Sequence, residues 1–308
     1  YTPDDRTSIE GVTVSRSGLY VSLLQNVKGS ILRFGVEAKS GEWRAEPLPL
    51  PPSGTVSLSA ANPHSGTVFV NYEDHITPDQ LSEYDAGANA LTLLKSLPPR
   101  FRADGLLVSQ HTVRSADGEA VPYFVIHRKG LKPDGSTPTI LYGYGGFEIS
   151  LKPSYSATIG KLWLERGGAY AVANIRGGGE FGPRWHKAAL KTNRQRAYDD
   201  FIAVAEDLAK RGITSPKRLG ISGGSNGGLL VGAIFTQRPD LMNAVVCRVP
   251  LLDMMRYTKL LAGASWAAEY GDPGDPKMRA ALLKYSPYQN MFPGRKYPKV
   301  FIETSTKD

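Results

Sequence analysis

The first hundred residues alternate between apolar and polar positions over short stretches, a pattern that predicts half-buried β-strands. The stretches cover residues 12–25, 29–37, 66–73 and 80–87, and clusters of Gly, Pro and Ser separate them. Two segments are similar, SGLYVSLL from Ser17 and SGTVFVNY from Ser65, with an offset of 48 residues. That offset is close to the length of a β-propeller blade, roughly 40–50 residues. Because a propeller needs at least about four blades, we expect residues 1–100 to be a partial propeller with further blades before Tyr1.

Beyond residue 100 the pattern changes to apolar runs without polar alternation, separated by helical stretches. After a hairpin around the Asp117-Gly118 turn, the pattern predicts buried strands at 137–146, 169–179, 218–225, 243–250 and 299–305. Helices are predicted from about 198 to Gly212, where the glycine ends the helical spacing, and over 226–240. This order favours a mostly parallel sheet covered by helices on both faces. We place the domain boundary between residues 100 and 101.

Composition and charge restrict the class of protein. With 41% hydrophobic and 21% charged residues, the chain has an ordinary globular composition. The formal net charge of +8 arises from 37 Lys and Arg residues that are scattered along the chain, which argues against nucleic-acid binding. No apolar run approaches the roughly 18 residues that a membrane helix needs, so we expect no membrane segment. The single cysteine, Cys247, excludes an internal disulfide. Because the sequence does not begin with Met, the cellular compartment stays open.

The segment LGISGGSNGGLL places Ser225 between two pairs of glycines, where a predicted buried strand meets a predicted helix. Gly223, Ser225 and Gly227 have the G-x-S-x-G spacing of a nucleophile elbow. In such a turn a strained backbone lifts the serine hydroxyl clear of the sheet. The N–H of the next residue, Asn226, then faces the point where negative charge develops, as does the helix N-terminus. The motif therefore predicts that Ser225 is a nucleophile.

Two other interpretations of the glycines are weaker. A phosphate-binding loop would need to end in Gly-Lys-Ser/Thr, and the segment at Ser225 does not. Gly177, Gly179 and Gly182 have the spacing of a dinucleotide-binding fingerprint, with Asp199 and Asp200 downstream. However, PRWHK follows these glycines where a helix of small residues is expected, and the two aspartates fall within a predicted helix instead of at a strand end.

Several longer segments of the second half carry a family resemblance. In chain order they are LYGYGGFEIS, AVANIRGGGEFGPRWH, TSPKRLGISGGSNGGLL, QRPDL, SWAAEYG and KYSPYQN. Together they resemble the prolyl oligopeptidase family of serine peptidases over residues 100–308, and the β-rich front part resembles the last blades of that family's propeller. The resemblance implies an α/β-hydrolase domain over 101–308 and a seven-bladed β-propeller. It also implies a monomeric enzyme that cleaves proline-containing oligopeptides after proline and needs neither metal nor cofactor.

The resemblance assigns roles to individual residues. It implies Ser225 as the nucleophile, with an oxyanion hole formed by the Asn226 N–H and the hydroxyl of Tyr144 in YGYGG. Asp308, which follows the last predicted strand, is implied as the acid that orients the catalytic histidine. An apolar slot suits proline because it rewards burial of the ring and leaves a charge without a partner. The residues implied for this slot are Trp266, Phe147, Tyr270 and Leu251.

The catalytic histidine should follow the acid along the chain, because α/β-hydrolases have the order Ser, Asp, His. All five histidines, at positions 64, 75, 111, 127 and 186, precede Ser225. We therefore expect the base beyond Asp308, in a later segment of a longer protein. Two alternatives stay open. One is an enzyme like oligopeptidase B that cuts after Arg or Lys, with Glu269 supplying a carboxylate, and the other is a binding module that has the hydrolase fold without catalysis.

Overall fold

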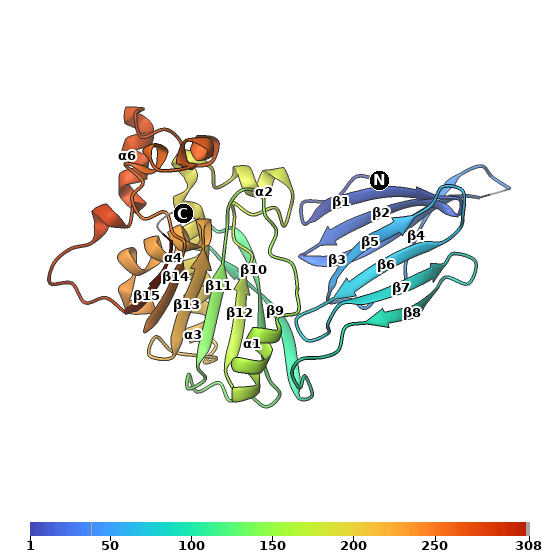
Figure 1. Cartoon of the computed structure of the whole chain (residues 1–308), viewed down its shortest axis with the longest axis horizontal. Helices are drawn as coiled ribbons and strands as arrows, with labels where there is room; N and C mark the ends of the chain where they lie inside the picture. Colours follow the sequence, from blue (N-terminus) through green and yellow to red (C-terminus); the bar gives the residue numbers. More distant parts are fainter. Residues whose placement is uncertain (38, 306–308) are drawn as a thin grey trace. The chain divides into compact units, whose positions relative to one another are not determined.

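The computed structural model describes residues 1–37 and 39–305, and the chain divides into two compact units (Figure 1). The first, which we call the β unit, comprises Tyr1–Asp104, Lys152–Glu165 and Glu180–Gly182. The second, the α/β unit, comprises Gly105–Leu151, Arg166–Gly179 and the chain from Pro183 onward. Each unit is thus assembled from three stretches of the sequence.

The β unit holds two four-stranded antiparallel sheets in which neighbouring strands are consecutive in the chain. The first sheet consists of β1 (Thr7–Ser15), β2 (Gly18–Gln25), β3 (Lys28–Val36) and β4 (Trp43–Pro47). The second consists of β5 (Thr55–Ala61), β6 (Val68–Glu73), β7 (Gln80–Asp85) and β8 (Ala90–Ser96). The repeat seen in the sequence aligns β2 with β6, the second strand of each sheet. The offset between the two segments is therefore the spacing from one sheet to the next.

Apolar side chains from both sheets share one core. Strand β6 alternates strictly between buried and half-buried positions, so that Val68 and Val70 enter the core while their neighbours do not. Tyr20 of the first sheet meets Tyr84 of the second edge to face, with ring centroids 6.1 Å apart. This geometry adds to the stabilisation that burial of the rings already gives. The two sheets are thus held together by this shared core.

The predicted strand at 12–25 is wrong in one respect, because the segment forms two strands. Ser15 pairs with Gly18, so β1 and β2 are joined by a tight two-residue turn. The apolar alternation continues through this turn, and the sequence pattern therefore runs the strands together. The pattern also does not predict β5, nor does it predict β4 and β8, whose side chains are almost all exposed and so lack an apolar face.

The α/β unit is built around a seven-stranded sheet with the order β15-β14-β13-β11-β12-β10-β9. These strands are β9 (Leu106–Arg114), β10 (Ala120–Arg128), β11 (Thr139–Gly143), β12 (Ala169–Ala173), β13 (Leu219–Gly224), β14 (Ala244–Arg248) and β15 (Lys299–Glu303). Strands β11 to β15 are parallel, and the hairpin β9–β10 adds an antiparallel edge. The prediction of a mostly parallel sheet is confirmed. After β12 the chain crosses to the other side of β11 to form β13, and ligands bind outside the carboxyl ends of strands at such a reversal.

Two helices of the α/β unit, α3 (Gln195–Lys210) and α4 (Asn226–Gln237), are those that the sequence pattern predicts, and the pattern does not predict the others. The α-helices of the chain are α1 (Ala157–Leu162), α2 (Pro183–Lys187), α3 (Gln195–Lys210), α4 (Asn226–Gln237), α5 (Ala267–Tyr270) and α6 (Pro276–Tyr285). Helix α3 buries Tyr198, Phe201 and Leu208 and packs on β9 and β10, while α4 packs on β13, β14 and α3. Short 3₁₀ helices span Leu164–Arg166, Lys191–Asn193, Pro239–Leu241, Tyr257–Lys259, Gly263–Trp266 and Tyr288–Asn290.

Candidate active site

Ser225 is the single residue between the end of β13 and the start of α4. Its backbone has φ 56° and ψ −119°, a region that residues with a side chain rarely adopt, and its side chain is exposed. Its N–H donates a hydrogen bond to the carbonyl of Arg248 at the end of β14, 2.9 Å away. The strained turn therefore presents the hydroxyl at the carboxyl edge of the sheet, as the G-x-S-x-G spacing predicts.

The glycines beside Ser225 are required by close approach of the backbone. A Cβ atom at Gly223 would lie 2.2 Å from the carbonyl oxygen of Gly227, and a Cβ at Gly227 would lie 2.7 Å from that of Gly143. Neither distance leaves room for a side chain. The turn is therefore compact because β13, the first turn of α4 and the end of β11 are in contact.

Tyr144 is brought next to Ser225 by the register of two parallel strands. Tyr142 of β11 pairs with Ser222 of β13, so Tyr144 leaves β11 at the same edge and level at which Ser225 leaves β13. Burial raises the pKa of Tyr144, whereas a hydrogen bond with the Ser225 side chain and the charge of Arg194 lower it to a smaller extent. The phenol is therefore protonated at neutral pH and available as a hydrogen-bond donor beside the serine hydroxyl.

Asn226 contributes its main chain at the first position of α4 and is completely buried. Its Nδ2 donates to the main-chain carbonyl of Tyr144, 2.6 Å away. Its Oδ1 accepts hydrogen bonds from the Tyr270 hydroxyl at 2.7 Å and from the Arg194 guanidinium. The side chain is thus fully engaged with protein groups, while the main-chain N–H belongs to the unpaired first turn of a helix.

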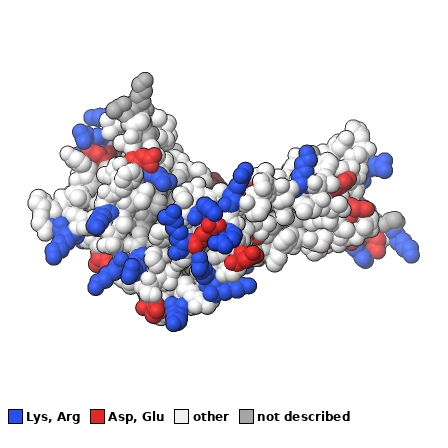
Figure 2. Space-filling model, turned by 60° about the horizontal axis from the view of Figure 1, so that its bottom comes forward, with Lys and Arg blue, Asp and Glu red and all other residues white. Residues whose placement is uncertain are grey.

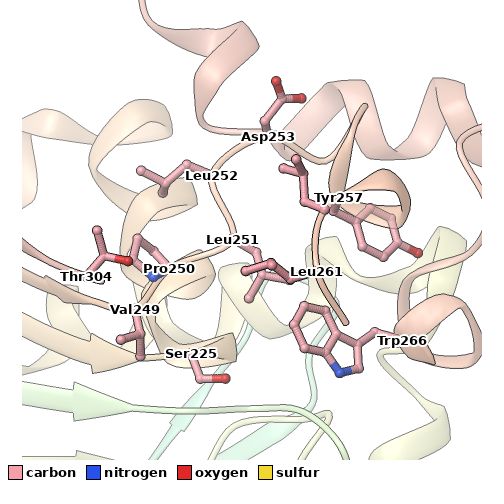
Figure 3. A pocket seen from close by; sticks show the side chains of 11 residues that line it. Ser225, Val249, Pro250, Leu251, Leu252, Asp253, Tyr257, Leu261, Trp266 and Thr304 are labelled. Atoms are coloured by element: carbon pink, nitrogen blue, oxygen red, sulfur yellow. The ribbon is translucent and has the colours of Figure 1, made fainter. Parts of the chain in front are cut away.

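A cavity of about 190 Å³ opens beside Ser225 (Figure 3). Figure 3 shows Ser225, Leu251 and Trp266 around the same hollow, with the carboxylate of Asp253 directed away from Ser225. Most of the lining is apolar and comes from the segments that follow β14 and β15. The lining residues are Ser225, Val249, Pro250, Leu251, Leu252, Asp253, Tyr257, Leu260, Leu261, Trp266 and Thr304.

The acidic groups near this site are already paired with other groups of the protein. Asp253 accepts from Arg256 Nε at 2.6 Å and from Gln289 Nε2 at 2.9 Å. Glu269 is only 4% exposed and accepts from Arg194 Nη1 at 2.9 Å, and its other oxygen is 2.7 Å from Nε2 of His186. Neither carboxylate is therefore presented to the cavity as an unpaired charge.

The sequence-predicted pocket residues are only partly brought together. Leu251 and Trp266 line the cavity, whereas Phe147 and Tyr270 are not among its lining residues. Tyr270 is fully buried, and the Phe147 ring packs edge to face on that of Tyr270, with centroids 5.7 Å apart. Asp308 lies outside the described residues. His186 is engaged with Glu269, so its Nε2 already has a partner within the α/β unit.

Sequence reasoning missed the part that Arg194 plays in this site. Arg194 is 1% exposed and bonds both Glu269 and Asn226, although it precedes α3 in the chain without any motif around it. Burial lowers the pKa of its guanidinium, but Tyr198, Tyr270 and Glu269 around it raise the pKa above the ordinary value. The residue is therefore a permanently charged group inside the unit. The sequence gives no signal for this role, because an arginine next to an ordinary helix pattern is usually expected on the surface.

The glycines of the weaker dinucleotide interpretation serve packing in the structure. A Cβ at Gly177 would lie 2.4 Å from the carbonyl oxygen of Gly145, and one at Gly179 would lie 2.2 Å from that of Glu148. Asp200 is buried in α3 and bonds the guanidinium of Arg176 at 2.7 Å. These glycines therefore admit the turn that follows Tyr144, and Asp200 already has a partner.

We next considered metal ligands, membrane-spanning helices, the cysteine and the surface charge of the described residues. Among the residues that the structure describes, no cluster of His, Cys, Asp and Glu could hold a metal ion, and no helix is long and apolar enough to cross a membrane. The thiol of Cys247 is buried and donates to the carbonyl of Gly228, and burial raises its pKa to about 12. On the face drawn in Figure 2, Lys and Arg are spread among acidic and uncharged residues.

Comparisons with known proteins match this arrangement. The family model described as the prolyl oligopeptidase family matches residues 153–308. An uncharacterized peptidase of Sinorhizobium fredii is 52% identical over 308 residues, which are 100% of this chain and 42% of that protein. A prolyl endopeptidase of Elizabethkingia meningoseptica is 41% identical over 262 residues, 85% of this chain and 37% of that protein. The structure of a post-proline cleaving enzyme from Rickettsia typhi superimposes with a TM-score of 0.88 at 38% identity, covering 97% of this chain and 43% of that one.

The exposed serine on a strained strand-to-helix turn, at the carboxyl edge of a mostly parallel sheet, defines an α/β-hydrolase fold. The two antiparallel sheets before it have the form of propeller blades, as the predicted fold class requires. The chain belongs to the prolyl oligopeptidase family, so the resemblance carried by its motifs is confirmed. It spans about 42% of the length of the Sinorhizobium fredii relative.

Proposed function

We propose that the protein to which this chain belongs is a serine peptidase that hydrolyses oligopeptides on the carboxyl side of proline. The observation that carries the proposal is the exposed hydroxyl of Ser225, beside the protonated phenol of Tyr144 and at the mouth of an apolar cavity. A nucleophile, an oxyanion donor and a side-chain pocket converge there. Such convergence is what an acyl-transfer site requires.

In the proposed reaction the Ser225 Oγ attacks the carbonyl carbon that precedes the scissile bond, and a base takes its proton. The carbonyl oxygen becomes an oxyanion that accepts hydrogen bonds from the Tyr144 hydroxyl and the Asn226 N–H. The C–N bond then breaks, and the protonated base gives its proton to the leaving amine. Water attacks the resulting ester by the same steps in reverse order, which releases the acid and regenerates Ser225.

We assign the acid that orients the base to Asp308 and the base to a histidine outside these 308 residues. Strand β15 ends at Glu303 beside β14, and Thr304 after it lines the cavity, so the chain leaves β15 at the same edge of the sheet as Ser225. His186, the last histidine of the sequence, is engaged by Glu269. The relatives are more than twice as long as this chain, and a later segment of such a protein would supply the base.

We assign the proline ring to the hollow between Leu251 and Trp266. Burial of the ring against apolar side chains would contribute roughly 1.5–3 kcal/mol, and the flat indole offers it a face. Phe147 and Tyr270 pack on each other and do not line this hollow, so we leave them out of the pocket. Cleavage after Arg or Lys, as by oligopeptidase B, would need an unpaired carboxylate, whereas Glu269 and Asp253 are already bonded to Arg194 and Arg256.

We also infer that residues 1–100 form the last blades of a seven-bladed propeller and residues 101–308 form the catalytic domain of a monomer. Two sheets of four consecutive antiparallel strands support this assignment. Strands β1, β4 and β8 leave apolar side chains such as Val12, Trp43 and Leu93 exposed. Neighbouring blades of a complete ring would cover part of such surface.

A fluorophosphonate probe on the full-length protein tests the nucleophile. We expect one label per molecule on Ser225 and none in Ser225→Ala, whose kcat should fall by about 10⁶. Ser222→Ala is the matched control, since Ser222 lies within β13 and should leave the labelling of Ser225 intact. A folded wild-type protein that takes up no label would instead indicate a binding module that has the hydrolase fold without catalysis.

Paired chromogenic peptides test the pocket. Peptides that differ only in Pro or Arg before the scissile bond should be cleaved with a strong preference for Pro. A preference for Arg would overturn the assignment of the cavity while leaving Ser225 as nucleophile.

A further inference from the structure

A buried polar cluster lies behind Tyr144 and Asn226, and we call it the Arg194 cluster: Arg194, Glu269, His186, Asn226 and Tyr270. The guanidinium of Arg194 is its centre. Nη1 donates to Glu269 Oε1 at 2.9 Å, and Nη2 donates to Asn226 Oδ1. The Arg194 Cζ also lies 5.3 Å from the ring centroid of Tyr270. One planar group therefore holds two different partners at once, which is the property that distinguishes arginine from lysine.

The first partner, Asn226, connects the cluster to the main chain of Tyr144. Because its Oδ1 accepts from both Arg194 and Tyr270, its amide nitrogen must face the other way, toward the Tyr144 carbonyl. The Asn226 amide also packs closely against the main chain of Gly146, because a Cβ at Gly146 would lie only 2.5 Å from Asn226 Nδ2. Asn226, whose N–H is one proposed oxyanion donor, thus fixes the backbone of Tyr144, whose hydroxyl is the other.

The second partner, Glu269, connects the cluster to the same loop three residues further on. Glu269 Oε1, which accepts from Arg194, also accepts from the main-chain N–H of Phe147 at 3.0 Å. Phe147 has φ 55°, so this turn is strained and needs outside contacts to hold it. Arg194 is therefore the common donor behind both ends of the turn from Tyr144 to Phe147.

We propose that Arg194 is a positioning residue for the oxyanion hole, acting through Asn226 and Glu269 to hold the Tyr144 phenol in register with the Asn226 N–H. It is not among the residues that line the cavity beside Ser225. The proposal rests on the proposed function. Arg194→Lys keeps the charge but replaces the two-partner fork by a single ammonium, so the turn loses one of its two supports.

The experiment measures kcat and KM of the full-length protein on a prolyl peptide for Arg194→Lys, Tyr144→Phe and the double variant. We expect Arg194→Lys to lower kcat about 10- to 100-fold with KM changed less than about threefold, since an interaction made in the transition state is weakened. In the Tyr144→Phe background the same substitution should cost less than about threefold, because the phenol that it positions is already gone.

The matched control is Arg176→Lys, which alters another buried arginine that bonds a buried carboxylate of the same unit. It should leave kcat within about twofold in either background, since additivity is expected for sites without shared partners. Glu269→Gln, which keeps an oxygen acceptor for Phe147, carries the test if Arg194→Lys does not fold, and its loss of kcat should show the same dependence on the Tyr144 hydroxyl.

Three results would overturn the proposal. They are an equal loss with and without the Tyr144 hydroxyl, a loss confined to KM, and a folded Arg194→Lys protein with wild-type kcat. If the wild-type protein neither cleaves prolyl peptides nor takes up a fluorophosphonate, the proposed function itself fails and the positioning role falls with it. Cleavage by the wild type together with additive effects rejects the positioning role alone.

Discussion

Arg176 and Arg194 lie buried in the same α/β unit, and each bonds a buried carboxylate, yet they tie together different parts of the molecule. Arg176 bonds Asp200 through Nε at 3.0 Å and Nη2 at 2.7 Å, and Asp117 through Nη1 at 2.6 Å. It therefore joins α3 to the turn of the β9–β10 hairpin. Arg194 joins α5 to the turn after Ser225 and to the loop after Tyr144. We call the first group, Arg176, Asp200 and Asp117, the Arg176 cluster.

The difference shows that burial and ion pairing alone do not reveal whether a charged group serves function. Removing one partner of either pair leaves an uncompensated buried charge, which is costly in any location. What separates the two clusters is the identity of the groups they hold. The Arg176 cluster holds elements of the fold, whereas the Arg194 cluster holds the two proposed oxyanion donors. Experiments that separate stability from turnover can test this distinction.

Among the experiments that test this comparison, the largest effect is expected at Arg176 and should appear in stability. Arg176→Met leaves Asp200 buried without its charged partner, which should lower the free energy of unfolding by about 3–5 kcal/mol. Urea unfolding of the full-length protein measures this loss. Turnover per folded molecule, counted by labelling of Ser225, should change less than about twofold. A large fall in turnover would show that the Arg176 cluster also affects catalysis, and would contradict the distinction between the two clusters.

Tyr144→Phe should have the next largest effect, and it should appear in turnover. Loss of one oxyanion donor should lower kcat by about 10²- to 10³-fold, or about 2.7–4 kcal/mol, with little change in unfolding. Steady-state kinetics on a prolyl peptide measure it. Tyr142→Phe, two residues earlier in β11, is the control, since Tyr142 carries no such role. An unchanged kcat for Tyr144→Phe would remove the phenol from the oxyanion hole.

Trp266→Ala sharpens the comparison at a residue that lines the cavity but belongs to neither cluster. Loss of the ring face should cost roughly 1.5–3 kcal/mol of binding, and kcat/KM for a prolyl peptide should fall accordingly. Trp43→Ala removes an exposed tryptophan of β4 and should leave kcat/KM unchanged. The cavity would not be the proline pocket if both variants behaved alike.

Asp117→Asn should have the smallest effect, because this carboxylate is 41% exposed and solvent screens its bond to Arg176. The bond holds the pKa of Asp117 below its ordinary value. The stabilisation is therefore present above about pH 4, where the unfolded carboxyl is ionised, and is lost as the pH falls through the lowered folded-state pKa. We expect about 0–1 kcal/mol between wild type and variant at pH 7 and a smaller difference at pH 3. A difference independent of pH would contradict the assignment.

Much of the fold and the central part of the site could be predicted from the sequence. Strands of a covered parallel sheet form apolar runs without alternation, which is why β11 to β15 are recognisable. The prediction that the last of them is buried is wrong, because β15 lies at the edge of the sheet and is mostly exposed. The turn at Ser225 is recognisable because its backbone strain and close contacts demand glycines on both sides. In both cases the structural requirement falls on a few consecutive residues, so a local sequence pattern reveals it.

The rest depends on contacts between distant positions. Arg194, Asn226 and Glu269 are far apart in the sequence and lie together only in the folded unit, so no local pattern marks them as one cluster. Tyr270 illustrates the same limit, because it shares a motif with Trp266 but ends a helix of only four residues, α5. Four residues carry no periodicity that could tell a cavity-facing side chain from a buried one. The sequence therefore finds the aromatic residues but not the face that each occupies.

The order of the strands also affects when the site comes into existence during folding. Each sheet of the β unit pairs strands that are consecutive in the chain, so its hairpins close over short loops. The contact between Asn226 and Tyr144 joins positions 82 apart, and such long-range closures are slow. We therefore expect the serine and its phenol neighbour to meet after the hairpins of the β unit have closed. Under the proposed function, a nascent chain would therefore lack an assembled oxyanion hole while its own unfolded segments are still exposed to attack.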